Sequence, residues 1–177
     1  INECCDVINV DSGVDYRLRT LEQAELFHFP LDKKADENLN HYFQQLAIEA
    51  GQMGKVITIN NRPLATVQES VGVVHFEFST LCESARSQGD YMELSRLYHT
   101  VLLANVTQMG VDNDDSTRRF IALVDEFYER HVKLIISAEV ALEELYVDGR
   151  LTFEFKRCLS RLQEMQSYSY LASEHLP

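Results

Sequence analysis

The chain has 177 residues, 45% of them hydrophobic and 25% charged, which is enough to form one domain with a substantial core. Its net charge of −12, without a Lys/Arg cluster to offset it, argues against binding to nucleic acid or to an anionic membrane surface. The sequence has no run of 18 apolar residues and no secretory signal, so we expect a cytoplasmic protein without a transmembrane segment.

The first part of the chain predicts a strand followed by a long helix. Residues 6–11 alternate and are rich in Val and Ile, as in a strand, and residues 14–21 are expected to continue extended. Residues 34–50 carry apolar side chains at helical spacing, so they predict a helix that ends at Gly51 and Gly54.

Two short apolar segments then flank Asn60-Asn61. Asn tolerates the left-handed conformation of a tight turn, so residues 55–59 and 63–67 predict a β-hairpin. Residues 73–78 predict a further strand.

The second half alternates helices and strands. Asp90 with Glu93 resembles a capping box, and the helix after it would bury four residues at helical spacing, Tyr91, Leu94, Leu97 and Tyr98. Strands are expected over 100–106 and 132–138, with a helix over 115–130 between them and a final helix over 155–167. This alternation predicts an α/β (mixed α+β) fold, a layered sheet with helices and partly parallel strands, plus the hairpin.

Asp125-Glu126 follows an apolar run and could be the acidic pair that ends a strand at a nucleotide-hydrolysing site. However, Phe120, Val124 and Phe127 belong to one helical face that continues to Tyr128. A strand over 120–125 would leave that continuation unexplained. The pattern therefore favours a helix with both carboxylates on its solvent side.

No catalytic or metal site is predicted. A phosphate loop needs GxxxxGK[ST], and Gly54-Lys55 lacks both the earlier glycine, where Glu49 stands, and the hydroxyl residue after the lysine. The cysteines and histidines show no metal-ligand spacing, and the cysteines are expected to be buried or free thiols. The side chains of Ser137, Ser160 and His131 do not form a recognisable nucleophile–base set, and the GxSxG motif is absent.

Several strings carry a family resemblance. They are VDSGVDYRLRTL at 10–21, NNRPLAT at 60–66, FSTLCESARSQGDYMELSRLYHTV at 78–101, RRFIALVDEFYERHVKLIISAE at 118–139 and LSRLQEMQS at 159–167. Together they closely resemble the C-terminal part of the ZapE-type cell-division ATPases, which belong to the AAA+ class of P-loop ATPases and have mitochondrial relatives.

The resemblance implies what the rest of the protein would do. Full-length members hydrolyse ATP with Mg²⁺, act on the tubulin-like division protein FtsZ and are possible homo-oligomers. Their phosphate loop and acidic motif would precede Ile1, and the chain begins without Met, so we expect a fragment that binds no cofactor by itself. Residues 1–13 would be an edge or remnant of the nucleotide-binding core, and residues 14–177 the C-terminal α/β domain.

AAA+ proteins commonly use a C-terminal arginine to sense the γ-phosphate, since Arg offers a permanent charge and a planar fork. Our candidates are Arg119 first, then Arg118 and Arg161, with Arg17 and Arg86 as further possibilities. Each could instead form a structural ion pair with one of the 28 acidic residues. The alternative function is a protein-interaction module without nucleotide chemistry, which would dock a protein through its acidic surface. Separately, Tyr168 and Tyr170 follow the last predicted helix and could lie at a partner surface.

Overall fold

The computed structural model describes residues 12–177, so the strand predicted over 6–11 lies outside the described residues. The helices and strands are, in chain order, α1 (Ser12–Gln23), β1 (Phe27–His28), α2 (Lys33–Leu46), β2 (Gln52–Met53), β3 (Val56–Ile59), β4 (Arg62–Ala65), β5 (Gln68–Ser70), β6 (Val73–Glu77), α3 (Gln88–Leu97), β7 (Thr100–Val106), α4 (Asp114–Glu129), β8 (Lys133–Ala138), α5 (Thr152–Glu164) and α6 (Tyr168–Ala172). A π-helical turn over Ser79–Glu83 follows β6.

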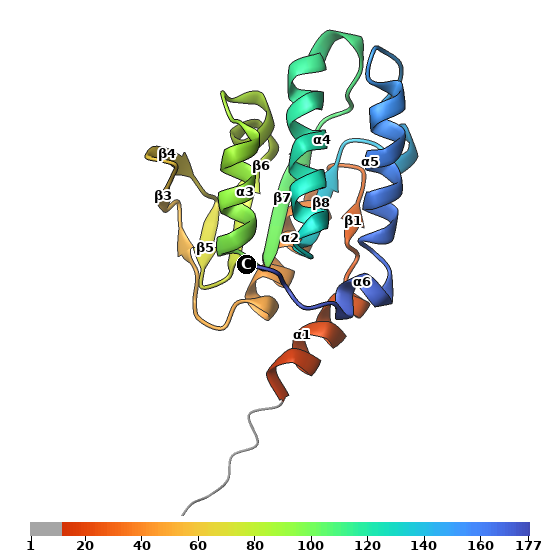
Figure 1. Ribbon diagram of the computed structural model, residues 1–177. Coiled ribbons are helices and arrows are strands. Elements are labelled where there is room, and N and C mark those ends of the chain that lie inside the picture. Colours follow the sequence, from red (N-terminus) through yellow and green to blue (C-terminus); the bar gives the residue numbers. More distant parts are fainter. Residues whose placement is uncertain (1–11) are drawn as a thin grey trace, which may run out of the picture.

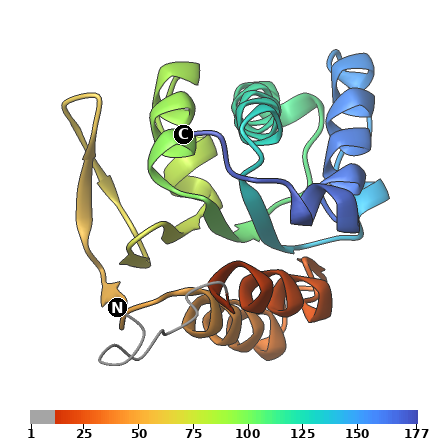
Figure 2. The same ribbon diagram turned by 60° about the horizontal axis from the view of Figure 1, so that its bottom comes forward.

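A mixed sheet forms the centre of the described part of the chain, with strand order β1-β8-β7-β6-β5-β2. The strands from β1 to β6 in this order are parallel, and β5 and β2 are added antiparallel. The helices α3 and α4 connect successive parallel strands, as such connections require. Figures 1 and 2 show α3, α4 and α5 on one face of the sheet and α1 and α2 on the other. The predicted layered α/β fold is therefore confirmed.

Both faces of the sheet are buried, which explains the long apolar runs in the central strands. Side chains alternate along β7, so Val101 and Leu103 pack under α3–α5 while Leu102 packs against α2. The larger cluster contains Phe120 and Phe127 of α4, both fully buried.

The predicted hairpin is present as β3 and β4, which pair antiparallel from Val56 to Ala65. Asn60 and Asn61 have φ values of 48° and 61°, so both adopt the left-handed conformation that a two-residue hairpin turn requires. The hairpin forms a separate sheet near α3 (Figure 1).

The prediction of extended backbone over 14–21 is wrong, because these residues belong to α1. Leu18 and Leu21 are three residues apart and pack together in the smaller core cluster, which a helix permits. The second helix is shorter than predicted: it ends at Leu46, where the N–H of Ala47 donates to the carbonyl of Phe43. Gly51 serves packing instead, since a Cβ there would lie 2.5 Å from the Phe43 ring.

The start of α3 also differs. Ser87 is the N-cap, and Asp90 is the third helical residue, whose buried carboxylate accepts a hydrogen bond from Ser87 N at 2.9 Å. Leu97 is exposed rather than buried, because the chain leaves the helix there for β7. The final helix is displaced by three residues and is followed by the separate helix α6.

Three short strands, β1, β2 and β5, were not predicted. With two or three residues each, they are too short to show a period of two. None of the helices within residues 12–177 has both the length and the apolar character that crossing a bilayer requires.

Candidate functional site

Asp125 and Glu126 lie in the last part of α4, so the helix prediction is confirmed and the strand alternative is wrong. Their carboxylates are only half-exposed, because each contacts a neighbouring helix. Asp125 accepts hydrogen bonds from Arg161 Nη1 at 2.9 Å and from Arg157 Nη2 at 2.7 Å. Glu126 accepts one from Gln88 Nε2 at 2.6 Å. The pair fastens α4 to α5 and α3.

Arg161, on α5, forms ion pairs with two carboxylates of α4. Its Nη2 donates to Glu129 at 3.0 Å, in addition to the bonds with Asp125. The guanidinium carbon lies 4.7 Å from the ring centroid of Tyr128, a cation–π geometry. These contacts hold the side chain between α4 and α5.

Arg119 points to a different side of α4. Its Nη1 donates to the carbonyl of Cys82 at 3.1 Å, in the π-helical turn after β6. Cys82 is buried and free, and burial raises the pKa of its thiol well above the ordinary value. Arg119 therefore holds that turn against α4.

Arg118 is exposed, and it makes no hydrogen bond or ion pair with any residue that the structure describes. It lines a cavity of about 250 Å³ together with Gln88, Asp125 and Glu154. The structure thus places Arg118 and Arg161 around Asp125, whereas Arg119 contacts the Cys82 turn. The guanidinium of Arg118 is open to a ligand.

The carboxyl ends of the parallel strands hold a second polar cluster, which the sequence patterns did not single out. Open α/β sheets commonly bind ligands at this edge. Here Asn105 adopts a φ of 61°, its side-chain amide donates to Glu77 at 2.8 Å, and its backbone N–H donates to Ser137 Oγ at 3.1 Å. The cluster joins the ends of β6, β7 and β8. The signal that could have found it is the polar residue at the end of each apolar run.

His28, at the end of β1, extends this edge. It is buried, and its two ring nitrogens contact Glu25 at 2.9 Å and Asp32 at 3.1 Å. The hydrogen bond to Glu25 is the main cause that raises the pKa of His28, with Asp32 acting in the same direction. In the part of the chain that the structure describes, no group of three His, Cys, Asp or Glu side chains is placed to hold a metal ion.

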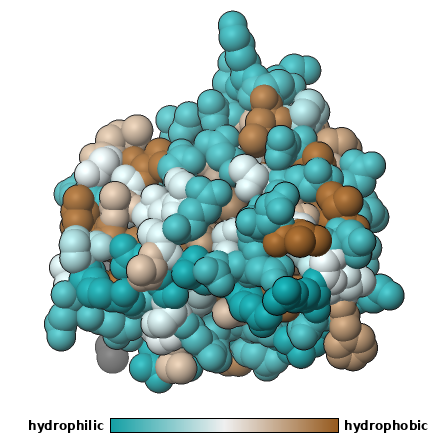
Figure 3. Space-filling model, turned by 90° about the horizontal axis from the view of Figure 1, so that it is seen from above, coloured by the Kyte–Doolittle hydropathy of each residue, from teal (hydrophilic) through white to brown (hydrophobic). Residues whose placement is uncertain are grey.

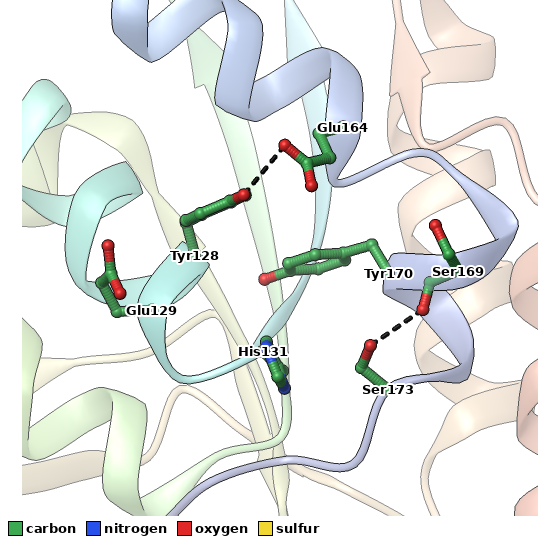
Figure 4. A pocket seen from close by; sticks show the side chains of 7 residues that line it. All are labelled: Tyr128, Glu129, His131, Glu164, Ser169, Tyr170 and Ser173. Atoms are coloured by element: carbon green, nitrogen blue, oxygen red, sulfur yellow. Dashed lines mark hydrogen bonds between the residues drawn. The ribbon is translucent and has the colours of Figure 1, made fainter.

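A surface hollow of about 250 Å³ lies where α4 ends and α6 packs (Figure 4). The Tyr128 hydroxyl donates to Glu164 at 2.8 Å, the rings of Tyr128 and Tyr170 stack at 5.7 Å, and His131 lies edge-on to Tyr170. The Tyr170 hydroxyl donates to the carbonyl of Val132 at 3.0 Å. Tyr170 is therefore buried where α6 packs against the end of α4, so its predicted place at a partner surface is wrong. Tyr168 is exposed.

The three side chains tested as a nucleophile–base set do not meet. Ser137 Oγ contacts Asn105, Ser160 Oγ donates to the carbonyl of Lys156, and His131 Nδ1 contacts the carbonyl of Glu174. Their hydroxyls and ring are thus used in separate local contacts.

Comparison with known proteins gives a consistent result. The AFG1-like ATPase family model matches residues 1–174. The chain is 54% identical over 176 residues to the cell division protein ZapE of Escherichia coli K12, covering 99% of this chain and 47% of that protein. It is 26% identical over 208 residues to lactation elevated protein 1 homolog B of Danio rerio, covering 98% of this chain and 41% of that protein. No solved structure matches.

The chain spans about half the length of the curated relatives that it matches. The resemblance to ZapE-type proteins, expected from the quoted strings, is confirmed. From the match over nearly all of its length, the chain belongs to the AFG1-like ATPase family.

Proposed function

We propose that this chain is the C-terminal part of a ZapE-type cell-division ATPase, which couples the nucleotide state of the whole protein to a protein partner. The 54% identity to E. coli ZapE over 99% of the chain carries this proposal. The family resemblance suggests FtsZ and the division ring as the target and the cytoplasm as the location.

In this proposal ATP and Mg²⁺ bind to a phosphate loop outside residues 1–177. Gly54-Lys55 does not replace it. Gly54 forms the turn between β2 and β3 with a φ of 62°, and Lys55 Nζ pairs with Glu69 at 2.6 Å. The Gly54 N–H donates to the carbonyl of Val67 at 2.9 Å, so it is used in a backbone contact and not for phosphate.

Arg118 is the arginine that we favour as the nucleotide sensor. A sensor must exchange its contacts as the γ-phosphate leaves, so a side chain without internal partners is suited to the role. Arg119 and Arg161 stay candidates, but each would first have to leave Cys82 or Asp125 and Glu129.

The test uses a protein that contains this chain together with the phosphate loop. Arg118→Ala is expected to lower the ATP turnover number at least tenfold, which is less than the roughly 10³- to 10⁵-fold contribution of an arginine finger. Arg119→Ala and Arg161→Ala are expected to have smaller effects. Arg96→Ala, which removes an exposed arginine of α3, is the matched control.

Three near-wild-type turnover numbers would remove all three arginines from the nucleotide site. The 177-residue chain alone is expected to show no ATP hydrolysis, and robust turnover by it would overturn the proposal.

A protein-interaction module without nucleotide chemistry is the alternative function. It is favoured by exposed apolar residues at the end of the molecule where α4 and α5 begin, namely Val111, Val147 and Phe153. Figure 3 views the molecule from above and shows apolar residues as separate patches among hydrophilic ones. Partner binding that is equally tight with and without ATP in the longer protein would favour this alternative.

A further inference from the structure

A cavity of about 340 Å³ lies at the amino ends of β7 and β8, between α1 and the segment that follows α6. We call it the basic cavity, because Arg17, His99, Lys133 and His175 all line it. Four basic side chains in one place are unexpected on a chain with a net charge of −12.

Lys133 provides a buried positive charge at the floor of this cavity. It is 7% exposed, and its ammonium donates to the carbonyls of His131 at 2.9 Å, Tyr170 at 3.1 Å and Ser173 at 2.7 Å. All three protons are therefore used, but the acceptors are uncharged. Burial lowers the pKa of Lys133 to about 8, and no carboxylate acts to raise it.

Arg17 reaches the cavity from α1. It is half-buried, and among the side chains that the structure describes, those of residues 16–177, it has no hydrogen-bond or ion-pair partner. Glu174 also borders the cavity, but it is exposed and bonds to His131 only through its carbonyl. The guanidinium thus lacks the carboxylate that an arginine in such a position usually pairs with.

His99 reports the sign of the local field. Its Nδ1 contacts Thr100 Oγ1 at 2.9 Å, and its ring lies 6.4 Å from that of His175, whose Nε2 donates to the carbonyl of Ser95 at 2.6 Å. Burial is the main cause that lowers the pKa of His99 to about 4, and the charges of Arg17, His175 and Lys133 act in the same direction. The basic side chains around His99 thus disfavour a further positive charge there.

The opposite wall is apolar. Leu21 and Leu171 are buried, and Leu18 is half-buried beside them. A volume of about 340 Å³ falls within the range of roughly 300–1,000 Å³ in which proteins bind small molecules. A ligand that fits both walls has a charged head and an apolar part.

We propose that the basic cavity binds a small amphiphilic anion, whose carboxylate or phosphate is held by Arg17 and whose apolar part lies against Leu18, Leu21 and Leu171. Arginine binds either oxyanion with two parallel hydrogen bonds. The positive field of Lys133 adds to this attraction without a direct bond from its ammonium. The basic cavity shares no lining residue with the cavity that Arg118 lines, so the proposal of anion binding does not depend on the proposed function.

Isothermal titration calorimetry of the 177-residue chain tests the proposal with four probes: hexyl phosphate, hexanoate, inorganic phosphate and hexanol. Hexyl phosphate, hexanoate or both are expected to bind at one site at least ten times more tightly than hexanol and inorganic phosphate. A preference for hexyl phosphate assigns the site to phosphate esters, and a preference for hexanoate assigns it to carboxylic acids.

Arg17→Gln is expected to weaken binding at least tenfold, whereas Arg96→Gln, which removes an exposed arginine outside the cavity, should leave it unchanged. Ala172→Trp, at the exposed rim, should weaken binding by obstruction with Arg17 intact. The melting temperature of each variant without probe verifies that it is folded. Absence of saturable binding, equal affinity for hexanol or inorganic phosphate, or equal losses in the two arginine variants would overturn the proposal.

Discussion

Two regions of this protein differ in whether their basic side chains are paired with carboxylates. Between α4 and α5, Arg157 and Arg161 share Asp125, and Arg161 also pairs with Glu129. In the basic cavity, Lys133 donates hydrogen bonds to three carbonyls and lies 5.1 Å from the ring centroid of Tyr170, without a carboxylate partner. Arg17 has no hydrogen-bond or ion-pair partner among the described side chains. An acidic chain can therefore still hold cations without carboxylate partners, and this is the place where we propose that an anion binds.

The energetic roles of the two regions should differ as well. The network between α4 and α5 is partly exposed, so solvent weakens each ion pair to about 1 kcal/mol or less. Lys133 is almost fully buried, so solvent weakens its hydrogen bonds much less.

Lys133→Met should give the largest effect. The change leaves the carbonyls of His131, Tyr170 and Ser173 without donors in a buried place, so we expect the free energy of unfolding to fall by about 4 kcal/mol. Urea denaturation measures this, with Lys156→Met on the exposed side of α5 as the control. A loss as small as that of the control would show that α6 does not depend on Lys133.

Lowering the pH should affect two buried histidines in opposite ways. The ring nitrogens of His28 contact two carboxylates, whereas neither ring nitrogen of His75 has a hydrogen-bond partner among the described residues. Burial lowers the pKa of His75 from 6.5 to about 4, and Asp36 offsets this only in part. Between pH 6.5 and 4, His75 therefore binds a proton in the unfolded chain but not in the folded chain. The contribution of uncharged His75 to the free energy of unfolding is fully present above pH 6.5 and falls by about 3 kcal/mol as the pH decreases to 4.

His75→Leu should remove this part of the pH dependence, as urea unfolding at pH 7, 5.5 and 4.5 would measure. His28 acts with the opposite sign, because its raised pKa gives stability that is present at low pH and lost as the pH rises through the pKa. His28→Gln should therefore steepen the loss on acidification. An unchanged pH profile for the leucine variant would contradict the role of His75.

Asp125→Asn tests the paired region. Two arginines lose their shared negative charge, so the free energy of unfolding should fall by about 1.5 kcal/mol. In double-mutant cycles, coupling to Arg161 should exceed coupling to Arg157, because the two side chains are 21% and 55% exposed. Equal coupling energies would show that exposure does not decide the strength of these pairs.

Arg118→Ala should have the smallest effect on stability, within about 0.5 kcal/mol, since an exposed side chain without partners contributes little. Thermal unfolding measures this. A loss above 1 kcal/mol would mean that Arg118 holds the fold together, and the same variant would then be unsuitable for assigning a nucleotide sensor.

The local patterns predicted the elements whose burial follows one period. The helical face of Phe120, Val124 and Phe127 placed Asp125 on α4, and Asn60-Asn61 predicted the hairpin turn. The two-residue strands β1 and β2 escaped prediction because their positions depend on pairing with β8 and β5. The helix α1 was not predicted, because Gly13 is a poor helix former and the many polar residues of the segment make the spacing of Leu18 and Leu21 hard to recognise.

The α/β layering, the lack of a phosphate-loop motif in these 177 residues and the family could all be read from the sequence, since each depends on residues that are close together or on strings that match as written. Only the tertiary structure decided which arginines are free. Arg119 contacts Cys82 across 37 positions, Arg161 contacts Asp125 across 36, and Lys133 contacts Tyr170 across 37. Contacts over such separations arise from the packing of helices on a sheet, which no local pattern records.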